Sequence, residues 1–275
     1  MSATPIRHPA VAGRFYPRDA EVLRREVRAY LNDPPKQQRV RALGCIAPHA
    51  GYIYSGHVAG AVFGGLEIPE LCIVICPNHT GVGHPLAIVS EGSWETPLGS
   101  VPIDGAFATS LKQRYPLLEE DSSAHRNEHG AEVELPFLHS LQPNVKLVPI
   151  ALGTSQLEVL EELGSAVADA IAVANRPALI VASSDMNHYE SDAITRAKDS
   201  SAIEPILRLD AHGLYDAVTR RHISMCGFGP AIAMLTATKK LGAKRAELVK
   251  YATSGDISGD RDQVVGYAGI IVLAT

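Results

Sequence analysis

The segment that decides the fold is the apolar run Ala42-Leu43-Gly44-Cys45-Ile46-Ala47, which continues directly into Pro48-His49-Ala50-Gly51. A short, continuous apolar run is typical of a strand that is covered on both faces of its sheet. Proline and glycine then end the run, so we expect His49 at the carboxyl end of that strand. The same arrangement recurs in two further places: Leu71–Cys76 before Pro77-Asn78-His79, and Ala178–Ala182 before Ser183–Tyr189.

Apolar runs alternate with segments of helical periodicity along the whole chain. The runs predict strands over 43–47, 71–76, 86–89, 146–152, 178–182, 247–253 and 264–273. The periodic segments predict helices over 20–31, 55–63, 104–113, 131–141, 155–173, 195–209, 211–219 and 229–241. This alternation predicts an α/β fold, a three-layer sandwich whose central sheet is mixed but mostly parallel, with helices on both faces. We see no linker or repeat, so we expect a single domain over residues 1–275.

Composition narrows the classes of function. The chain has 275 residues, 46% of them hydrophobic, and a formal net charge of -5, so we expect no nucleic-acid partner. No window approaches the ~20 apolar residues of a membrane span, and the first residues lack the apolar stretch of a signal peptide. We therefore expect a cytoplasmic protein without a membrane partner. The four cysteines should be free thiols, with Cys72 and Cys76 on one face of their strand.

Three strand ends carry side chains suited to chemistry. In an open α/β sheet, ligands bind beyond the carboxyl ends of the strands. His49, His79 and the pair Asp185 and His188 each follow a predicted strand, so we expect them to share one edge of the sheet. Each histidine alone is as well explained by a structural role, but three of them in turns at strand ends favour a functional site. Imidazole is a common metal ligand, and His49 with His79 is the expected ligand pair.

The sequence offers several candidates for a third donor. They are Cys226 and the carboxylates of Asp185, Glu128, Glu132 and Glu134. Cys226 lies in a glycine-rich turn before a predicted helix, where the helix dipole would lower the pKa of its thiol. A small buried cysteine in a tight turn is the alternative interpretation.

The stretch Asn127–Pro136 is dense in titratable residues. If this stretch is helical, Glu128 and Glu132 lie on one face, and His129 lies beside Glu132. Acidic residues in a first helical turn also arise from compensation of the helix dipole alone. We therefore expect these three residues to support the metal ligands from behind.

Seven motifs, taken together, resemble those of the Memo family. In chain order they are His8–Pro17, Ala47–Gly56, Pro77–Thr80, Asn127–Leu138, Ser183–Glu190, Cys226–Pro230 and Tyr267–Gly269. This family, also described as protein B of the AmmeMemoRadiSam system, is similar in structure to the class III extradiol (LigB-type) dioxygenases. The resemblance implies that His49, His79 and Cys226 bind a metal. It also implies that Asp185 and His188 line the same pocket, with His188 as an acid/base oriented by Asp185, and with Tyr52, Glu128, His129 and Glu132 nearby.

The resemblance suggests a cofactor and a kind of function. Fe(II) is the expected metal, with copper or zinc as alternatives, because a thiolate is a softer ligand than the carboxylate of the dioxygenases. We expect a metal-dependent, dioxygenase-like oxidoreductase that acts on an unidentified small molecule. The alternatives are a non-catalytic adaptor that binds a peptide or protein in a vestigial pocket, and a component of a modification pathway with radical-SAM and AMMECR1-like partners.

Overall fold

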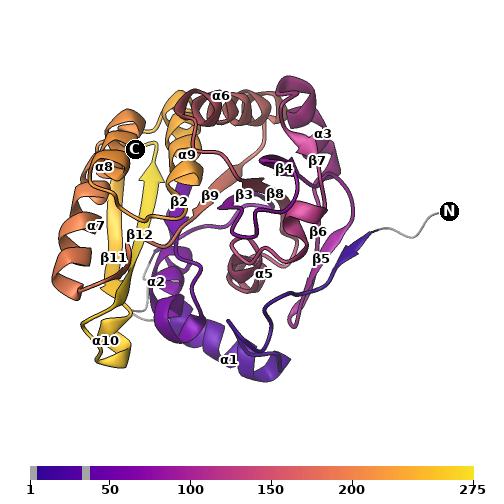
Figure 1. Cartoon of the computed structure of the whole chain (residues 1–275). Helices are drawn as coiled ribbons and strands as arrows, with labels where there is room; N and C mark the ends of the chain where they lie inside the picture. The colour runs from indigo at the N-terminus through magenta and orange to yellow at the C-terminus, as the bar shows by residue number, and fades with distance from the viewer. Residues whose placement is uncertain (1–4, 33–37) are drawn as a thin grey trace.

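The central sheet mixes parallel and antiparallel strands. The computed structural model describes residues 5–32 and 38–275, and in this part of the chain the sheet has nine strands (Figure 1). Its order is β10 (His188–Glu190), β12 (Val264–Leu273), β2 (Gly44–Ala47), β9 (Ala178–Ser183), β3 (Leu71–Pro77), β8 (Lys146–Leu152), β4 (Leu86–Ile88) and β7 (Glu119–Glu120), with β11 (Arg245–Thr253) paired to β12. Strands β2, β9, β3 and β8 are mutually parallel, whereas β12 and β4 run antiparallel to their neighbours β2 and β8.

Helices cover both faces of this sheet, which confirms the predicted three-layer α/β architecture (Figure 1). One face carries α1 (Ala20–Leu31), α2 (Tyr52–Gly64) and α5 (Leu135–Leu141). The other face carries α3 (Gly105–Arg114), α6 (Leu157–Ala174), α7 (Asp192–Leu207), α8 (Ala211–Arg220) and α9 (Phe228–Lys240). Three short helical segments lie in loops: α4 (Ser123–Arg126), the 3₁₀ turn η1 (Glu132–Glu134) and α10 (Gly255–Ser258).

The alternation of side chains along β3 divides the core into two layers. Ile73 and Ile75 are fully buried among residues of α6 and α9, whereas Cys72, Val74 and Cys76 are fully buried among residues of α1, α2 and α5. This is the two-residue period of a strand that is covered on both sides. The expected placement of Cys72 and Cys76 on one face is therefore confirmed, and both are free thiols.

Several parts of the chain depart from the expected elements, among them the short segments β7, β10, α4 and α10, which were not expected. A second sheet of three strands, β1 (Ile6–Arg7), β5 (Ser93–Thr96) and β6 (Gly99–Pro102), has no counterpart in the prediction, because strands this short leave little periodicity in the sequence. The helix expected over 131–141 begins later, since η1 precedes α5. Pro136 lies in the first turn of α5, where its missing N–H leaves no hydrogen bond unmade.

No helix within residues 5–32 and 38–275 is both long and apolar enough to cross a membrane.

Helices α1 and α2 are in close backbone contact at Gly60. A Cβ atom added at Gly60 would lie 2.6 Å from backbone atoms of Tyr30, which cannot rotate away as a side chain can. We expect Gly60→Ala to lower the free energy of unfolding by about 1–3 kcal/mol, because overpacking outweighs the better helix propensity of alanine. Urea unfolding followed by circular dichroism measures this loss. Ile53→Ala on the same helix, at a side chain that is 66% exposed, should stay within about 0.5 kcal/mol of the wild type. Equal losses in the two variants would contradict the prediction.

A buried carboxyl group on α7 connects this helix to two other segments. Asp199 is fully buried, and its two oxygens accept hydrogen bonds from the backbone N–H of Asn187 at 2.9 Å and from the hydroxyl of Tyr251 at 2.7 Å. Burial raises the pKa of Asp199 to about 6. The unfolded chain, with a pKa of about 3.9, releases this proton at lower pH.

This raised pKa predicts a pH-dependent loss of stability. Between about pH 4 and pH 6 the folded protein holds more protons at Asp199 than the unfolded chain does, so the stability this group contributes falls as the pH rises through that window. Asp199→Asn removes the titration. The unfolding free energy of the wild type minus that of Asp199→Asn should therefore fall by about 2 kcal/mol from pH 4 to pH 7. Urea unfolding at several pH values measures it, and a constant difference would refute the assignment.

Candidate metal centre

Three histidines from three loops converge at the carboxyl edge of the parallel strands. His49 follows β2, His79 follows β3, and His129 lies in the loop between α4 and η1. One ligand atom from each of the three lies within 4.8 Å of the other two. The centroids of the rings are 5.0 Å apart for His49 and His79, 5.2 Å for His49 and His129, and 4.4 Å for His79 and His129. Three imidazole nitrogens at this separation are a donor set for a transition metal.

The strand-end argument predicted two members of this cluster and missed the third. β9 lies between β2 and β3 and is parallel to both, so His49, His79 and Asp185 share one edge of the sheet, as expected. His129 was expected only in a supporting role, because no strand precedes it. The available signal was the density of titratable residues in Asn127–Pro136, which by itself could not separate a ligand from a supporting residue.

Hydrogen bonds hold two of the three imidazoles through their Nδ1 atoms. The Nδ1 atom of His49 lies 2.7 Å from the hydroxyl of Ser183, and the Nδ1 atom of His79 lies 2.8 Å from Oε1 of Glu128. A carboxylate accepts hydrogen bonds only, so His79 carries its proton on Nδ1 and leaves Nε2 free as a ligand atom. A histidine held in this way by a second group is typical of protein metal sites.

Glu128 is the charged support of the cluster. It is fully buried, and its oxygens accept hydrogen bonds from the backbone N–H of His79 at 2.6 Å, from its imidazole at 2.8 Å and from the N–H of Gly130 at 2.8 Å. Burial alone would raise the pKa of Glu128, but these hydrogen bonds and the nearby imidazoles lower it to about 2. Nδ1 of His129 also lies 3.5 Å from Oε1. A stable negative charge therefore lies directly behind His79 and His129.

The imidazoles themselves are disposed to stay neutral. Burial and the neighbouring His79 lower the pKa of His49 to about 3, and burial together with His49 lowers the pKa of His129 to about 4. A neutral imidazole keeps a nitrogen lone pair, which a protonated one lacks. At neutral pH these two residues are thus in the form that can bind a metal.

Cys226 lies next to this group of histidines without being part of it. Its sulfur is 3.3 Å from Nε2 of His49, but among the described residues the mutually close donors are the three histidines alone. The expectation of a lowered thiol pKa is wrong: burial raises the pKa of Cys226, and the charge of Asp185 raises it further. The cost of burying a thiolate therefore outweighs the favourable dipole of the following helix. Gly227 permits this close approach, because a Cβ there would lie 2.3 Å from Cβ of Ser184.

Asp185 and His188 have separate partners. Oδ1 of Asp185 accepts hydrogen bonds from the backbone N–H groups of His49 at 2.8 Å and Ala50 at 3.3 Å, which fixes the loop that carries His49. His188 instead donates from Nδ1 to the carbonyl of Ser224 at 2.9 Å, and its N–H donates to the Ser224 hydroxyl at 2.8 Å. Ser224, and not Asp185 as the resemblance implied, therefore orients the imidazole of His188. No pattern in the sequence pointed to Ser224.

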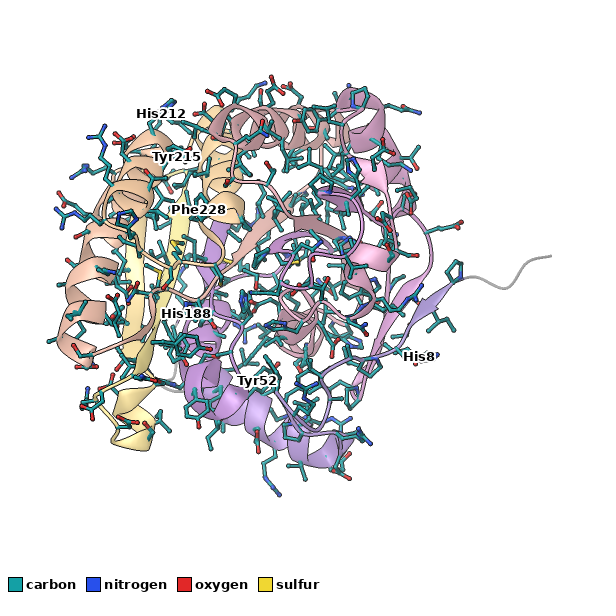
Figure 2. All side chains as sticks on the ribbon, in the orientation of Figure 1. His8, Tyr52, His188, His212, Tyr215 and Phe228 are labelled. Carbon is teal, nitrogen blue, oxygen red and sulfur yellow. The ribbon has the colours of Figure 1, made fainter. Side chains whose placement is uncertain are left out.

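Burial raises the pKa of Asp185, while the neighbouring imidazole of His188 acts in the opposite direction. His188 is half-buried and lies on the opposite side of Figure 2 from His8. The charge of its protonated form lowers the pKa of Asp185 and of His49. With Nδ1 bonded to Ser224, its Nε2 is the nitrogen that remains for exchange of a proton.

Tyr52 and Glu132 support the loop of His129 from the protein interior. The hydroxyl of Tyr52, a side chain that is only 2% exposed, donates a hydrogen bond to the carbonyl of Val133 at 2.7 Å. Glu132 is fully buried and forms an ion pair with Arg7 at 2.7 Å. Its oxygens also accept hydrogen bonds from the amino-terminal segment, namely from Ala10 N, Val11 N and the Tyr16 hydroxyl. The condition under which Glu128 and Glu132 would share a helical face is not met, because Glu128 lies outside the helical segments.

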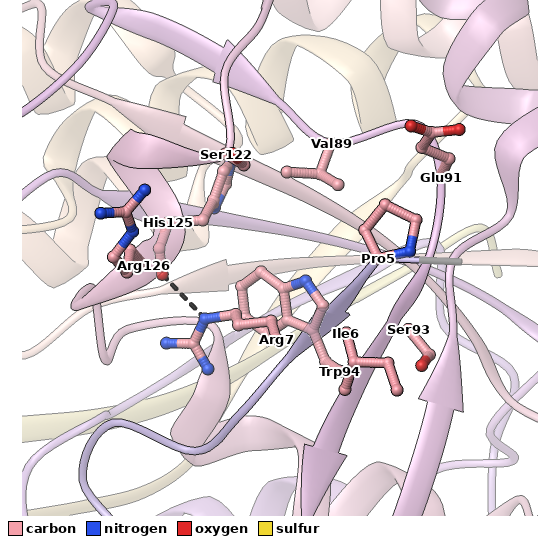
Figure 3. A pocket seen from close by; sticks show the side chains of 10 residues that line it. All are labelled: Pro5, Ile6, Arg7, Val89, Glu91, Ser93, Trp94, Ser122, His125 and Arg126. Atoms are coloured by element: carbon pink, nitrogen blue, oxygen red, sulfur yellow. Dashed lines mark hydrogen bonds between the residues drawn. The ribbon is translucent and has the colours of Figure 1, made fainter. Parts of the chain in front are cut away.

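A separate cavity lies beside the amino-terminal strand (Figure 3). It has a volume of about 250 Å³, and none of the three clustered histidines lines it. The guanidinium of Arg7 lies 4.1 Å from the centroid of the Trp94 ring and donates to the carbonyl of His125 at 2.8 Å. These contacts connect the amino-terminal segment to the loop before His129.

Comparison with known proteins identifies the family. The family model described as Memo-like protein matches residues 7–271. A MEMO1 family protein of Methanosarcina mazei is 45% identical over 269 residues, which cover 97% of this chain and 99% of the relative. The MEMO1 family proteins of Methanopyrus kandleri and Archaeoglobus fulgidus are 42% and 43% identical, over 96% and 97% of this chain and 98% and 99% of their own lengths.

A solved structure supports the fold. The crystal structure of an uncharacterized protein from Escherichia coli aligns with a TM-score of 0.54 at 13% identity, and the alignment covers 84% of this chain and all of that one. At this identity the likeness concerns the fold alone. Because the family model spans nearly the whole chain and the relatives match at over 40% identity, the chain belongs to the Memo family.

Proposed function

We propose that this protein binds a divalent transition metal at His49, His79 and His129 and acts as a metal-dependent oxidoreductase on a small molecule. The observation that carries the proposal is the convergence of three imidazoles, each with a ligand atom within 4.8 Å of the others. Two further features support it: the Nδ1 atoms of His49 and His79 already have protein partners, and the pKa values of His49 and His129 are lowered.

The donor set fits the metals that the sequence suggested. Imidazole nitrogen suits iron, copper and zinc alike, and three protein ligands leave coordination positions free for a substrate. Fe(II) is our first choice, because the groups around the site are nitrogen and oxygen donors. Entry of Cys226 as a fourth, thiolate ligand would favour copper or zinc.

The residues around the cluster have distinct tasks in this proposal. A bound metal would supply a Lewis acid and a centre for electron transfer at the edge of the sheet. Asp185 fixes the backbone of His49, and Glu128 holds His79. His188, anchored by Ser224, is the group that would take up or release a proton at Nε2 as a bound molecule reacts.

The first test is metal binding itself. The wild type, titrated anaerobically with Fe(II) and separately with Zn²⁺, should bind about one equivalent, as measured by isothermal calorimetry and by metal analysis after desalting. His79→Ala should weaken binding at least tenfold, because one of three ligands is lost and Glu128 loses its partner. His212→Ala is the matched control, since His212 lies on the surface, in an ion pair with Glu161 and far from His188 in Figure 2. Absence of binding by the wild type, or equal binding by the two variants, would reject the proposed site.

The second test separates the two ligand sets. If His129 is the third ligand, His129→Gln should weaken Zn²⁺ binding at least tenfold, whereas Cys226→Ser should change it by less than about threefold. Substitution with Co²⁺ gives an independent readout, because a thiolate ligand adds a charge-transfer band that an all-nitrogen site lacks. Such a band in the wild type, lost in Cys226→Ser, would replace His129 by Cys226 as the third ligand or add Cys226 as a fourth.

A further inference from the structure

Ser183 is the centre of a buried network beneath His49. Its hydroxyl oxygen lies 2.6 Å from the carbonyl of Gly130, 2.7 Å from Nδ1 of His49 and 2.9 Å from Oε1 of Glu134. Ser183 and Glu134 are both fully buried. A serine hydroxyl has one proton to donate and two lone pairs that accept. The three neighbours of Ser183 must therefore be matched to this one proton and these two lone pairs.

Only one assignment of protons satisfies all three contacts. The carbonyl of Gly130 can only accept, so the hydroxyl proton of Ser183 points to it. The two lone pairs of Ser183 then face His49 and Glu134, and both of these groups have to donate. His49 therefore carries a proton on Nδ1, and Glu134 carries a proton on its carboxyl group. With Glu134 ionised, two oxygens without a proton between them would face each other at 2.9 Å in the protein interior.

The surroundings of Glu134 agree with this assignment. Its second oxygen, Oε2, is buried and has no hydrogen-bond partner within residues 5–32 and 38–275. An ionised carboxylate with one free oxygen in the interior is very costly, whereas a neutral carboxylic acid is much less so. Burial raises the pKa of Glu134 well above its usual value, and the charge of Asp185 raises it further. Tyr52 and Cys45 lie near Glu134, and neither supplies a positive charge.

We propose that Glu134 is protonated and donates this proton in a hydrogen bond to Ser183, and that Ser183, whose own proton goes to the carbonyl of Gly130, is a positioning residue that holds His49 in the tautomer with its proton on Nδ1. His49 then has its lone pair on Nε2, the nitrogen that lies 3.3 Å from the sulfur of Cys226. In the metal-binding role proposed above, on which this part of the inference rests, that lone pair is the one that binds the metal.

Infrared spectroscopy tests the protonation of Glu134 without any metal. A protonated carboxylic acid has a carbonyl band that is separate from the bands of a carboxylate and shifts in D₂O. The difference spectrum of wild type minus Glu134→Gln at pH 7 should contain this band, because other protonated acids cancel. Glutamine keeps the shape of the side chain and a donor for Ser183, so this variant should fold. A difference spectrum with carboxylate bands only would overturn the proposal.

Nitrogen NMR of ¹⁵N-histidine-labelled, metal-free protein tests the effect on His49. The wild type and Glu134→Gln should both have His49 protonated on Nδ1. Ser183→Ala removes the acceptor of this proton, so a population of His49 protonated on Nε2 should appear. An unchanged tautomer in Ser183→Ala would overturn the proposal.

Metal affinity links this inference to function. With Zn²⁺ as the probe, Glu134→Gln should bind within about threefold of the wild type, and Ser183→Ala should bind about 10–100-fold more weakly. Equal affinity of the two variants would show that Ser183 does not position His49. If the wild type bound no metal, the proposed function would fail, while the infrared and NMR results would still decide whether Glu134 is protonated and whether Ser183 controls the tautomer of His49.

Discussion

The candidate metal centre depends on the parallel pairing of β2, β9 and β3. In this register Ala47 lies opposite Ser183 and Ile75 lies opposite Ala182, so the three strands end almost level with one another. The residues that follow each strand are therefore brought to one place, and Ser183 reaches His49 from the neighbouring strand. A slip of one residue would turn every side chain of a strand to the opposite face. The buried residues on both faces of β3 prevent such a slip, so the packing of the core also fixes the geometry of the centre.

Three buried carboxyl groups around the centre differ in the direction of their pKa shift because they differ in hydrogen-bond donors. Glu128 accepts three hydrogen bonds from nitrogen, and its pKa falls to about 2. Asp185 accepts from two backbone N–H groups, and Glu134 has Ser183 as its partner, so the pKa of each is raised by burial. The fixed negative charge of Glu128 thus lies behind His79 and His129. Burial is common to all three, and the local supply of N–H donors separates the lowered pKa of Glu128 from the raised pKa values of Asp185 and Glu134.

The sequence predicted the layers, the sheet edge and part of the centre. Apolar runs mark buried strands whatever surrounds them, so β3, β8, β9 and β12 could be placed within a residue or so, and His49 and His79 with them. His129 was harder to place, because the loop that carries it is held by contacts with Arg7 and Tyr16 through Glu132, over a hundred residues away. The pKa of Cys226 and the partner of His188 likewise depend on burial and on long-range contacts. No local sequence pattern encodes burial or long-range contacts, and the predictions that depended on them were the ones that were wrong.

The three histidines of the centre differ in their exposure to solvent. His49 is 1% exposed, whereas the side chains of His129 and His79 are 20% and 30% exposed, so a molecule from solvent reaches the cluster on the side of His79 and His129. His188 is half-buried, and the next residue, Tyr189, is 72% exposed with a φ of 59°. This left-handed conformation is unfavourable for a tyrosine and persists only where neighbouring contacts hold the backbone. The two hydrogen bonds between His188 and Ser224 are such contacts. The strained backbone therefore holds the imidazole of His188 near solvent, while His49 lies deeper.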